Sequence, residues 1–491
     1  MNGYSLKGGF VYLEETGAYS RKDLYIDSGE FSADTPYGAQ EIDISGKFVY
    51  PGFVDSHAHL IGTGRKSLEV DLEGCSSIES LADRLSVDRR IVRARGWDQE
   101  VLGFMPVRGK LDLITSEPTI ITRRCGHIAC VNSSLIKLFD LERLHGLDGS
   151  DIDLGILKER ALEEMDRIAK LSPAEVREAI EAGTRSFLKY GVTSVHSDDY
   201  HGIDYELLME ALSSANKMRV YEKLCISRKE DLEMIKHGRQ FETDFFRLRA
   251  AKMYLDGSLG ARTAAMIEPY HDSPTETGVL YMTADDLRPI VRRADREGIQ
   301  ICVHVIGDRS LEEALLAFEG SNSETLKHRL IHVQIASEDQ IRRIAGQRLT
   351  ASIQPVFVDS DSTIAPERFG PIRIKDAYPF GKMRDMGVVV AFSTDSPVES
   401  TSVVKNLVSA DRFFSRKDSI VMYSKTGHTL ANSVRSFALN PGDPADFFVT
   451  GSDLLKTRED TFADMTFVSG RLVHKLERNQ SRTVNRNSYC T

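Results

Sequence analysis

Two histidines, His57 and His59, stand one residue apart at the end of an apolar run that reads YPGFVDSHAHL. In an extended strand, residues two apart point to the same side, so both imidazoles face one way. Two neutral imidazoles that converge at the end of a buried strand make half of a zinc site. A satisfied or exposed histidine pair is the plainer interpretation, and the pair alone leaves both open.

Four further polar residues lie in or at the end of later apolar runs, where an aliphatic side chain would be expected. Barrel enzymes place their catalytic groups at the carboxyl ends of the strands, on one shared face. Imidazole nitrogens and carboxylate oxygens also suit Zn²⁺. Together with the histidine pair, these residues predict a metal centre for one or two divalent ions: Lys252, His304, His332 and Asp395.

Lys252 differs from the other members of this set because a lysine inside a barrel is costly unless its charge is paired or removed. Beside metal ions it could lose its proton and react with CO₂, and the carbamate would offer two oxygens to bridge two ions. Alternatively the side chain reaches solvent or pairs with Asp256. The residues alone leave these alternatives open.

Three other aromatic residues are weaker candidates for substrate contact. His127, in RRCGHIACVN, could reach over a site or be a loop histidine, and the second interpretation is favoured. Trp97, in RGWDQE, is the only tryptophan, for which structural packing competes with a place in a pocket wall. His196, in SVHSDD, falls at the end of an apolar run and could line a pocket.

The elements that position these residues follow a strand–helix rhythm. Short apolar runs without clean alternation are typical of parallel strands buried on both faces, and charged helical stretches between them indicate βα units. Helices are expected at 173–191, with Gly191 at its end, and at 283–298, with Thr283 as N-cap. The eight runs predict a (β/α)₈ TIM barrel: 48–57, 192–197, 219–225, 248–254, 299–305, 329–333, 349–355 and 388–395.

The two ends of the chain have a different texture from the middle. Residues 9–50 and the segment after the Pro-Gly-Asp-Pro turn alternate short apolar runs with turn residues, as antiparallel strands do. We therefore predict a small composite β-sandwich from 1–50 and 440–491, and a barrel over 51–439. The gap between the first two barrel strands is too long for one helix, which predicts an inserted subdomain at 61–165.

Composition narrows the functional class. The formal net charge is −10, from 63 basic and 73 acidic residues, and no basic tract offers a surface for a nucleic-acid backbone. No apolar stretch approaches the roughly 20 residues of a membrane span, and the first residues do not read as a signal peptide. The six cysteines form no CxxC pair, which favours a reducing cytoplasm. A homodimer is the commonest symmetric default.

The motifs resemble the amidohydrolase superfamily, and specifically its YtcJ-like branch with N-substituted formamide deformylase-like proteins. The resemblance covers nearly the whole chain and includes VYPGFVDSHAHL, GHIACVNSSLI, KMYLDGSLGARTAAM, HVIGDRSLEEAL and AFSTDSPVES. It implies that His57 and His59 bind a first ion and that His304 and His332 bind a second. It further implies that carboxylated Lys252 bridges both ions, and that Asp395 binds the first ion and acts as base. It lends weight to His127 and Trp97 as pocket residues.

The predicted activity is metal-dependent hydrolysis of an amide-like, non-peptide C–N bond in a small molecule. Metal ions lower the pKa of bound water to about 7, so that hydroxide exists at neutral pH. Asp395 would accept the proton of the nucleophile and pass it to the leaving nitrogen. Two alternatives stay open: ester, lactone or mononuclear deaminase chemistry on the same scaffold, and a non-catalytic scaffold protein.

Overall fold

The computed structural model describes residues 3–124, 127–433 and 435–477, so Cys125 and Cys490 lie outside the described residues. The chain forms two compact units. The first comprises Met1–Thr63, Gly183–Tyr200 and Leu208–Thr491, and the second comprises Gly64–Ala182 and His201–Leu207. The four described cysteines, Cys75, Cys130, Cys225 and Cys302, are free thiols.

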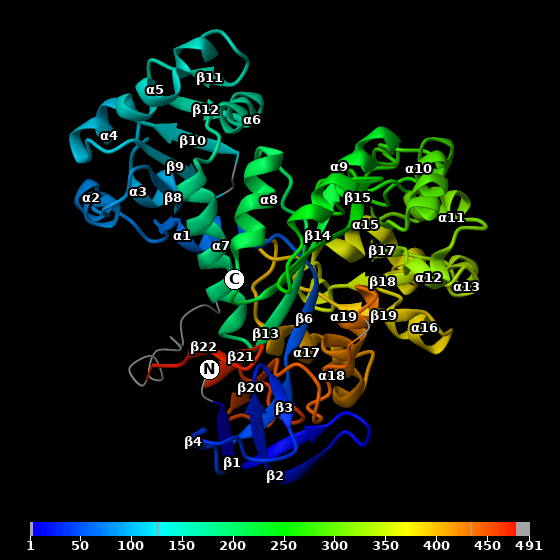
Figure 1. Ribbon diagram of the computed structural model, residues 1–491. Helices are drawn as coiled ribbons and strands as arrows, with labels where there is room; N and C mark the ends of the chain where they lie inside the picture. Colours follow the sequence, from blue (N-terminus) through cyan, green and yellow to red (C-terminus); the bar gives the residue numbers. More distant parts are fainter. Residues whose placement is uncertain (1–2, 125–126, 434, 478–491) are drawn as a thin grey trace. The chain divides into compact units, whose positions relative to one another are not determined.

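The first unit contains a barrel of parallel strands that follow one another in chain order. Its first and last strands meet where the backbone N–H of Asp395 donates to the carbonyl of His57 at 2.9 Å. The predicted TIM barrel is therefore confirmed. Its strands, which appear from blue through green to orange in Figure 1, are β6 (Phe53–Ala58), β13 (Val192–Ser197), β14 (Arg219–Cys225), β15 (Phe246–Tyr254), β16 (Gln300–Val305), β17 (Arg329–His332), β18 (Thr350–Ile353) and β19 (Val389–Phe392).

Helices connect the barrel strands, as the charged periodic segments predicted. Helix α10 (Ala284–Glu297) has the expected N-cap, because the Thr283 side chain accepts from the backbone N–H of Asp286, and it ends at Gly298 in the left-handed conformation. Helix α7 ends at Leu188, three residues before Gly191. The other connecting helices include α8 (Tyr205–Ser214), α9 (Leu232–Gly238), α11 (Asp308–Ala317), α12 (Ser323–Leu326), α13 (Glu338–Gly346), α14 (Phe357–Ser360), α15 (Ile364–Arg373) and α16 (Phe380–Asp385), then α17 (Val403–Ala410), α18 (Arg416–Tyr423) and α19 (Lys425–Leu430).

The run predicted as one strand over 48–57 is divided in two. Strand β5 (Phe48–Pro51) pairs with β1 and β20 outside the barrel, whereas β6 begins the barrel at Phe53. Gly52 lies between them so close to Thr193 that an added Cβ would stand 2.1 Å from the threonine Oγ1. The change of sheet therefore requires glycine at this position, which hydrophobic periodicity does not show.

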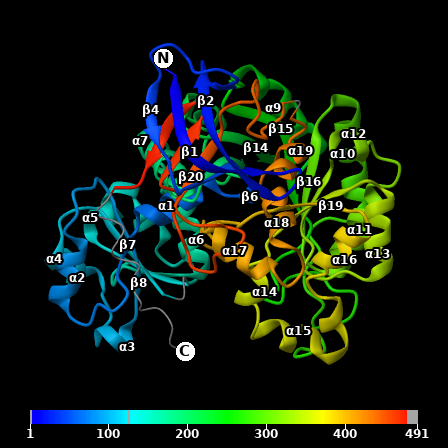
Figure 2. The same cartoon turned by 90° about the horizontal axis from the view of Figure 1, so that it is seen from below.

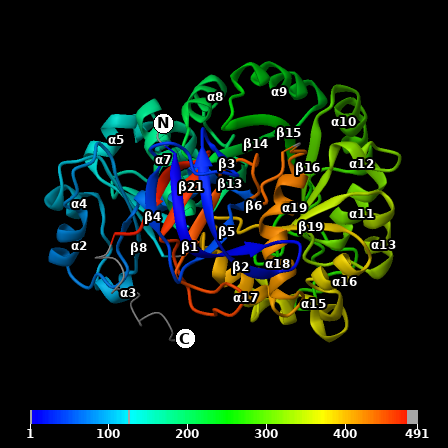
Figure 3. The same cartoon turned by 60° about the horizontal axis from the view of Figure 1, so that its bottom comes forward.

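Strands from both ends of the chain form one further sheet in the first unit, and Figures 2 and 3 show the blue N-terminal strands beside the red C-terminal ones. Its order is β22-β21-β20-β5-β1-β2-β3, with β4 paired to β1. The composite β-sandwich and the bounds proposed for it stay a prediction. The remaining strands of this sheet are β1 (Tyr4–Leu13), β2 (Ala18–Asp27), β3 (Glu30–Ser32), β4 (Gln40–Asp43), β20 (Phe447–Thr450), β21 (Met465–Val468) and β22 (Arg471–Lys475).

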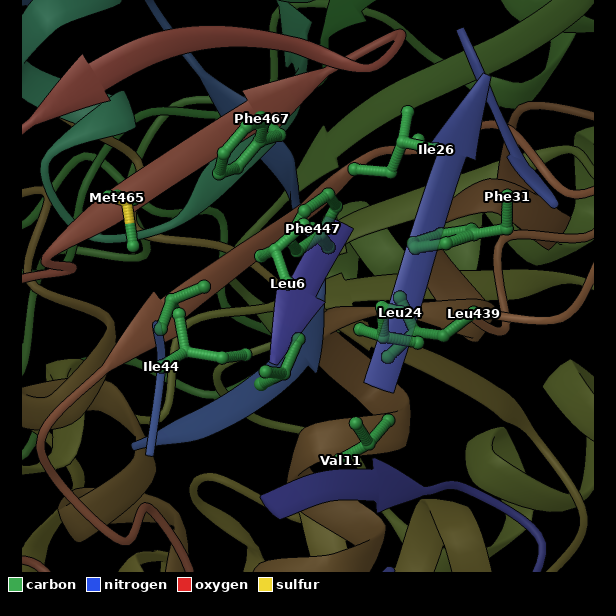
Figure 4. Close-up of a cluster of buried hydrophobic side chains, with 13 residues drawn as sticks. Leu6, Val11, Leu24, Ile26, Phe31, Ile44, Leu439, Phe447, Met465 and Phe467 are labelled. Carbon is green, nitrogen blue, oxygen red and sulfur yellow. The ribbon is translucent and has the colours of Figure 1, made fainter. Parts of the chain in front are cut away.

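A buried apolar cluster holds this sheet together, and Figure 4 shows its side chains converging from strands of both chain ends. Phe447 and Phe467 are stacked with ring centroids 4.5 Å apart. The sheet also contacts the barrel, because Phe448 packs on Phe53 with centroids 4.9 Å apart. In addition, Arg219 at the start of β14 pairs with Asp446 at 2.6 Å. Both chain ends thus support the amino-terminal side of the barrel strands.

The second unit has its own six-stranded sheet in the order β11-β12-β10-β9-β8-β7. Two buried apolar clusters stabilise it. The insertion predicted at 61–165 stays a prediction in its bounds. Its strands are β7 (Val70–Asp71), β8 (Val92–Trp97), β9 (Thr119–Arg123), β10 (Ile128–Val131), β11 (Ser150–Asp151) and β12 (Ile156–Lys158), and its helices are α2 (Ile78–Leu85), α3 (Gln99–Leu102), α4 (Arg108–Ile114), α5 (Ser133–Phe139) and α6 (Glu159–Ile168).

Helices α1 (Leu60–Leu68), α7 (Pro173–Leu188) and α8 have residues in both units. Across the described part of the chain, no helix combines the length and the apolar composition needed to traverse a membrane.

Candidate metal centre

Three of the predicted ligands converge where the first and last barrel strands meet. Nε2 of His57 lies 3.3 Å from Oδ1 of Asp395, and Nε2 of His59 lies 3.4 Å from the same oxygen. His57 is 1% exposed and Asp395 is 7% exposed. Asp395 follows β19 with φ 56°, a left-handed conformation that costs a non-glycine residue free energy and is typical of functional sites. The strand ends therefore assemble a compact N, N, O donor set.

A hydrogen bond orients the ring of His59 so that Nε2 faces Asp395. Nδ1 of His59 donates to the backbone carbonyl of Asp198 at 2.7 Å, which places the imidazole lone pair on Nε2. Nδ1 of His57 is buried and has no hydrogen-bond partner among the described residues. Burial opposes a charge on His59 and on Asp395, but their mutual attraction raises the pKa of His59 and lowers the pKa of Asp395.

His304 and His332 form a second pair, with ring centroids 4.5 Å apart. Nδ1 of His332 lies 2.9 Å from Oε1 of Gln354, so Nδ1 donates and Nε2 carries the lone pair. Nε2 of His304 donates to the carbonyl of Gly257 at 2.9 Å, which leaves Nδ1 as its free nitrogen. Burial lowers the pKa of His332 to about 4 and the pKa of His304 well below its usual range. Both imidazoles are therefore neutral, as metal ligands must be.

Lys252 lies in β15 and is completely buried. Its Nζ is 3.0 Å from Oδ2 of Asp198, and it stands 4.1 Å from the centre of the Tyr254 ring. The interpretation that Lys252 reaches solvent or pairs with Asp256 is wrong. Asp256 instead accepts backbone N–H groups of Ile306, Gly307 and Ala265.

The two histidine pairs and Asp395 lie at a cavity of about 480 Å³, a volume typical of small-molecule sites. Four of the predicted ligands line it together with Asp395: His57, His59, His304 and His332. The remainder of its wall combines apolar and polar side chains: Tyr254, Ser258, Leu259, Gly260, Ile306, Gln334, Phe357, Ser360, Asp361, Val398 and Glu399.

The structure does not bring His196 to this cavity. Its ring is 1% exposed, Nδ1 accepts from Nη1 of Arg329 at 2.9 Å, and the Tyr221 ring centre lies 5.0 Å away. Burial, together with the Arg329 charge, lowers the pKa of His196 well below its usual range. The residue thus packs inside the barrel, and its substrate contact is a prediction that this arrangement does not support.

The other two weaker candidates belong to the second unit. Trp97 is completely buried in an apolar cluster, and its Nε1 donates to the carbonyl of Ile121 at 3.1 Å. His127 is exposed, and Nδ1 lies 3.3 Å from Oε2 of Glu159. A role of either residue in substrate binding stays a prediction.

Several residues that position the predicted ligands were not predicted from the sequence. Asp198 contacts Lys252 with its side chain and His59 with its backbone, and it accepts the Tyr254 hydroxyl at 2.8 Å. Its position could have indicated this role, because Asp198 directly follows β13 at the same end of the barrel as the other site residues. The same holds for Gln354, one residue beyond β18.

The donor set fits a divalent ion. The converging groups are imidazole nitrogens and a carboxylate, which suit Zn²⁺ and related metals. The hydrogen bonds to the distal nitrogens of His59 and His332 orient the rings, as the surroundings of metal-binding histidines usually do. His57, with a buried Nδ1 that no described residue engages, is the one ring of the set that has no such support.

A parallel barrel with histidines and a carboxylate at the mouth of a cavity is the arrangement expected of a barrel hydrolase with a metal centre. The amidohydrolase family is matched by residues 40–474, and the chain belongs to this family of carbon–nitrogen bond hydrolases.

Relatives and solved structures agree with this assignment. The chain is 28% identical over 440 residues to the amidohydrolase-family protein YtcJ of Bacillus subtilis, covering 82% of each chain. It is 25% identical over 404 residues to N-substituted formamide deformylase of Arthrobacter pascens, covering 73% of this chain and 72% of that enzyme. A metal-dependent hydrolase from Pyrococcus furiosus superposes with a TM-score of 0.82 at 31% identity, covering 92% of this chain and all of the other.

Proposed function

We propose that the chain hydrolyses an amide-like, non-peptide C–N bond of a small molecule at a divalent metal centre. The observation that carries the proposal is the convergence of His57 Nε2 and His59 Nε2 on Asp395 Oδ1, at a cavity of about 480 Å³. The similarity to N-substituted formamide deformylase favours N-formyl and N-acyl amides as the first substrates to examine.

Zinc is the proposed metal, with His57, His59 and Asp395 holding one ion and His304 and His332 able to hold a second. Lys252 would bridge the two as a carbamate. In this step the neutral Nζ attacks the carbon of CO₂, an N–C bond forms, and one proton leaves the nitrogen. Two observations support the proposal. Lys252 is completely buried, and its strand β15 pairs with β16, the strand that carries His304.

When bound, the metal supplies hydroxide at neutral pH and polarises the scissile carbonyl. Asp395 accepts a proton from the attacking water and donates it to the leaving nitrogen, acting as general base and then as general acid. The hydrogen bond from His59 lowers the pKa of Asp395 despite its burial, which favours the ionised form before reaction. The apolar walls of the cavity would exclude other water.

Metal content per chain tests this function most directly. The protein is purified without chelators and without added metal, and elemental mass spectrometry is combined with hydrolysis of N-formyl and N-acyl amides. About two equivalents of a divalent ion with turnover support the bridged pair, and about one supports a mononuclear site. If the protein neither binds metal nor hydrolyses these amides after reconstitution with divalent ions, the proposal is overturned in favour of a non-catalytic scaffold.

Two variants separate the proposed roles. Asp395→Asn should lower kcat by a factor of about 10² to 10⁴, the usual contribution of a general acid–base group. Near wild-type turnover with metal still bound would contradict the role of Asp395. Lys252→Ala should lose one ion together with activity, and full activity with two ions retained would show that the bridge is wrong.

The location and assembly of the enzyme belong to the same proposal. A cytoplasmic homodimer that acts on small molecules, without nucleic-acid or membrane partners, is the proposed working form. Sedimentation velocity of the metal-loaded protein at micromolar concentration tests the homodimer.

A further inference from the structure

A cluster of hydrogen-bond acceptors lies on the cavity wall outside the proposed metal centre. Asp361, directly after α14, accepts from Nε2 of Gln334 at 3.2 Å and from the Tyr378 hydroxyl at 2.7 Å, both through Oδ2. Asp361 and Gln334 line the cavity. Oδ1 of Asp361 has no hydrogen bond from a described residue, so one carboxylate oxygen is available at the wall.

The same contact fixes the orientation of Gln334. The amide NH₂ of Gln334 donates to Asp361, so the amide oxygen faces away from this carboxylate. This Oε1 is buried, with the residue 3% exposed, and it has no partner among the described residues. A buried acceptor without a donor is unfavourable, and a ligand with N–H groups would satisfy it.

Away from the proposed metal ions, the ionisable side chains of the cavity wall point the same way. Besides Asp395, the described lining residues include the carboxylates Asp361 and Glu399 and no lysine or arginine. Arg368 donates to the carbonyl of Gly260 in the wall but is held in an ion pair with Asp272. Burial raises the pKa of Asp361, and a neighbouring cation would favour its ionised form.

Four apolar side chains also line the cavity: Leu259, Ile306, Phe357 and Val398. They suit a hydrocarbon segment between a scissile amide at the metal centre and a polar group at Asp361. A free carboxylate at that position would instead meet like charges and acceptors without a donor.

We propose that the cavity selects amides that carry a protonated amine, with the ammonium donating to Asp361 and Gln334. That these ligands are hydrolysed rests on the proposed function, whereas binding of an ammonium group does not. Asp361 is thus the residue that determines specificity, and Gln334 supplies a second acceptor for the ammonium group.

Calorimetry of the metal-loaded protein tests the binding step without relying on turnover. The probes are pentylammonium and pentanoate, and the proteins are wild type, Asp361→Asn and Tyr378→Phe. Because a carboxylate can also bind a metal, the readout for each probe is the ratio of its Kd in the variant to its Kd in wild type. Asp361→Asn should weaken pentylammonium about tenfold or more, as expected for loss of a charged hydrogen bond, and leave pentanoate equal or tighter.

Tyr378→Phe is the matched control, because it removes a hydrogen bond to Asp361 but keeps the carboxylate. It should bind pentylammonium within a few-fold of wild type. Asp361→Glu, which restores the charge, should recover part of the affinity and guards against a folding defect in Asp361→Asn. Equal affinity of wild type and a folded Asp361→Asn for pentylammonium would overturn the inference.

Hydrolysis then separates this inference from the proposed function. Three substrates of similar length are compared: N-(5-aminopentyl)acetamide, N-hexylacetamide and 6-acetamidohexanoate. We expect kcat/KM to fall in that order, and Asp361→Asn to remove the advantage of the amine. Hydrolysis of the neutral and the anionic amides as fast as the cationic one would refute the selectivity while the hydrolase function stands. Asp361-dependent ammonium binding without any hydrolysis would refute the hydrolase function alone.

Discussion

Nζ of Lys252 lies 3.0 Å from Oδ2 of Asp198, and neither side chain is exposed to solvent. The backbone carbonyl of Asp198 also accepts from Nδ1 of His59. One residue after β13 therefore contacts a lysine in β15 and sets the tautomer of a histidine after β6. This relationship makes Asp198 the link between the two parts of the proposed metal centre.

Removal of the Asp198 charge should destabilise the fold. In metal-free Asp198→Asn, where Lys252 carries no carbamate, the buried ammonium loses its counter-ion, so we expect the free energy of unfolding, measured by urea titration, to fall by about 3–5 kcal/mol. The double variant with Lys252→Met should recover part of this loss. Asp23→Asn, in the exposed pair with Lys7, is a control that should change stability far less. If Asp198→Asn loses no more unfolding free energy than the control, the Lys252–Asp198 ion pair does not contribute to stability as proposed.

Gln354 should matter for metal affinity more than for the fold. Gln354→Leu removes the hydrogen bond that orients His332, and such losses weaken metal binding by about 10–100-fold. Competition with a fluorescent chelator measures the affinity. Gln347→Leu, at a partly buried glutamine whose Nε2 donates to Leu315, is the matched control. Identical metal affinity of Gln354→Leu and wild type would exclude this role.

His428 should make stability depend on pH. Burial lowers the pKa of His428 to about 4, so the unfolded chain binds the proton more readily between that value and about 6.5. The free energy of unfolding therefore falls as pH falls through this window, and His428 contributes up to about 3 kcal/mol of the change. Urea unfolding at several pH values should show a shallower dependence in His428→Leu, and an unchanged slope would contradict the assignment.

The sheet built from both chain ends should depend on its stacked pair of phenylalanines. Phe467→Ala removes a fully buried ring that lies 4.5 Å from Phe447, and we expect a loss of about 3–5 kcal/mol. Tyr37→Ala, at a fully exposed ring, should stay within about 0.5 kcal/mol of wild type. Thermal unfolding compares the two. Equal stabilities would mean that this cluster does not contribute to the folded state.

The barrel and the proposed ligands could be predicted from the sequence because their determinants are local. Buried parallel strands appear as apolar runs, and the carboxyl ends of these strands meet at one face. His57, His59 and Asp395 could therefore be expected together although Asp395 lies 336 positions after His59 in the chain. His304 and His332 followed from the same reasoning.

The repeat of strands and helices and the residue types at the strand ends could be inferred from the sequence, since periodicity and composition are properties of neighbouring residues. Only the folded chain fixes the partner of Lys252, the inward packing of His196 and the division of residues 48–57 between two sheets. It also decided that Gln334 leaves an acceptor unpaired at the cavity wall. Each of these depends on strand register and on hydrogen bonds between residues far apart in the chain, which local patterns do not encode.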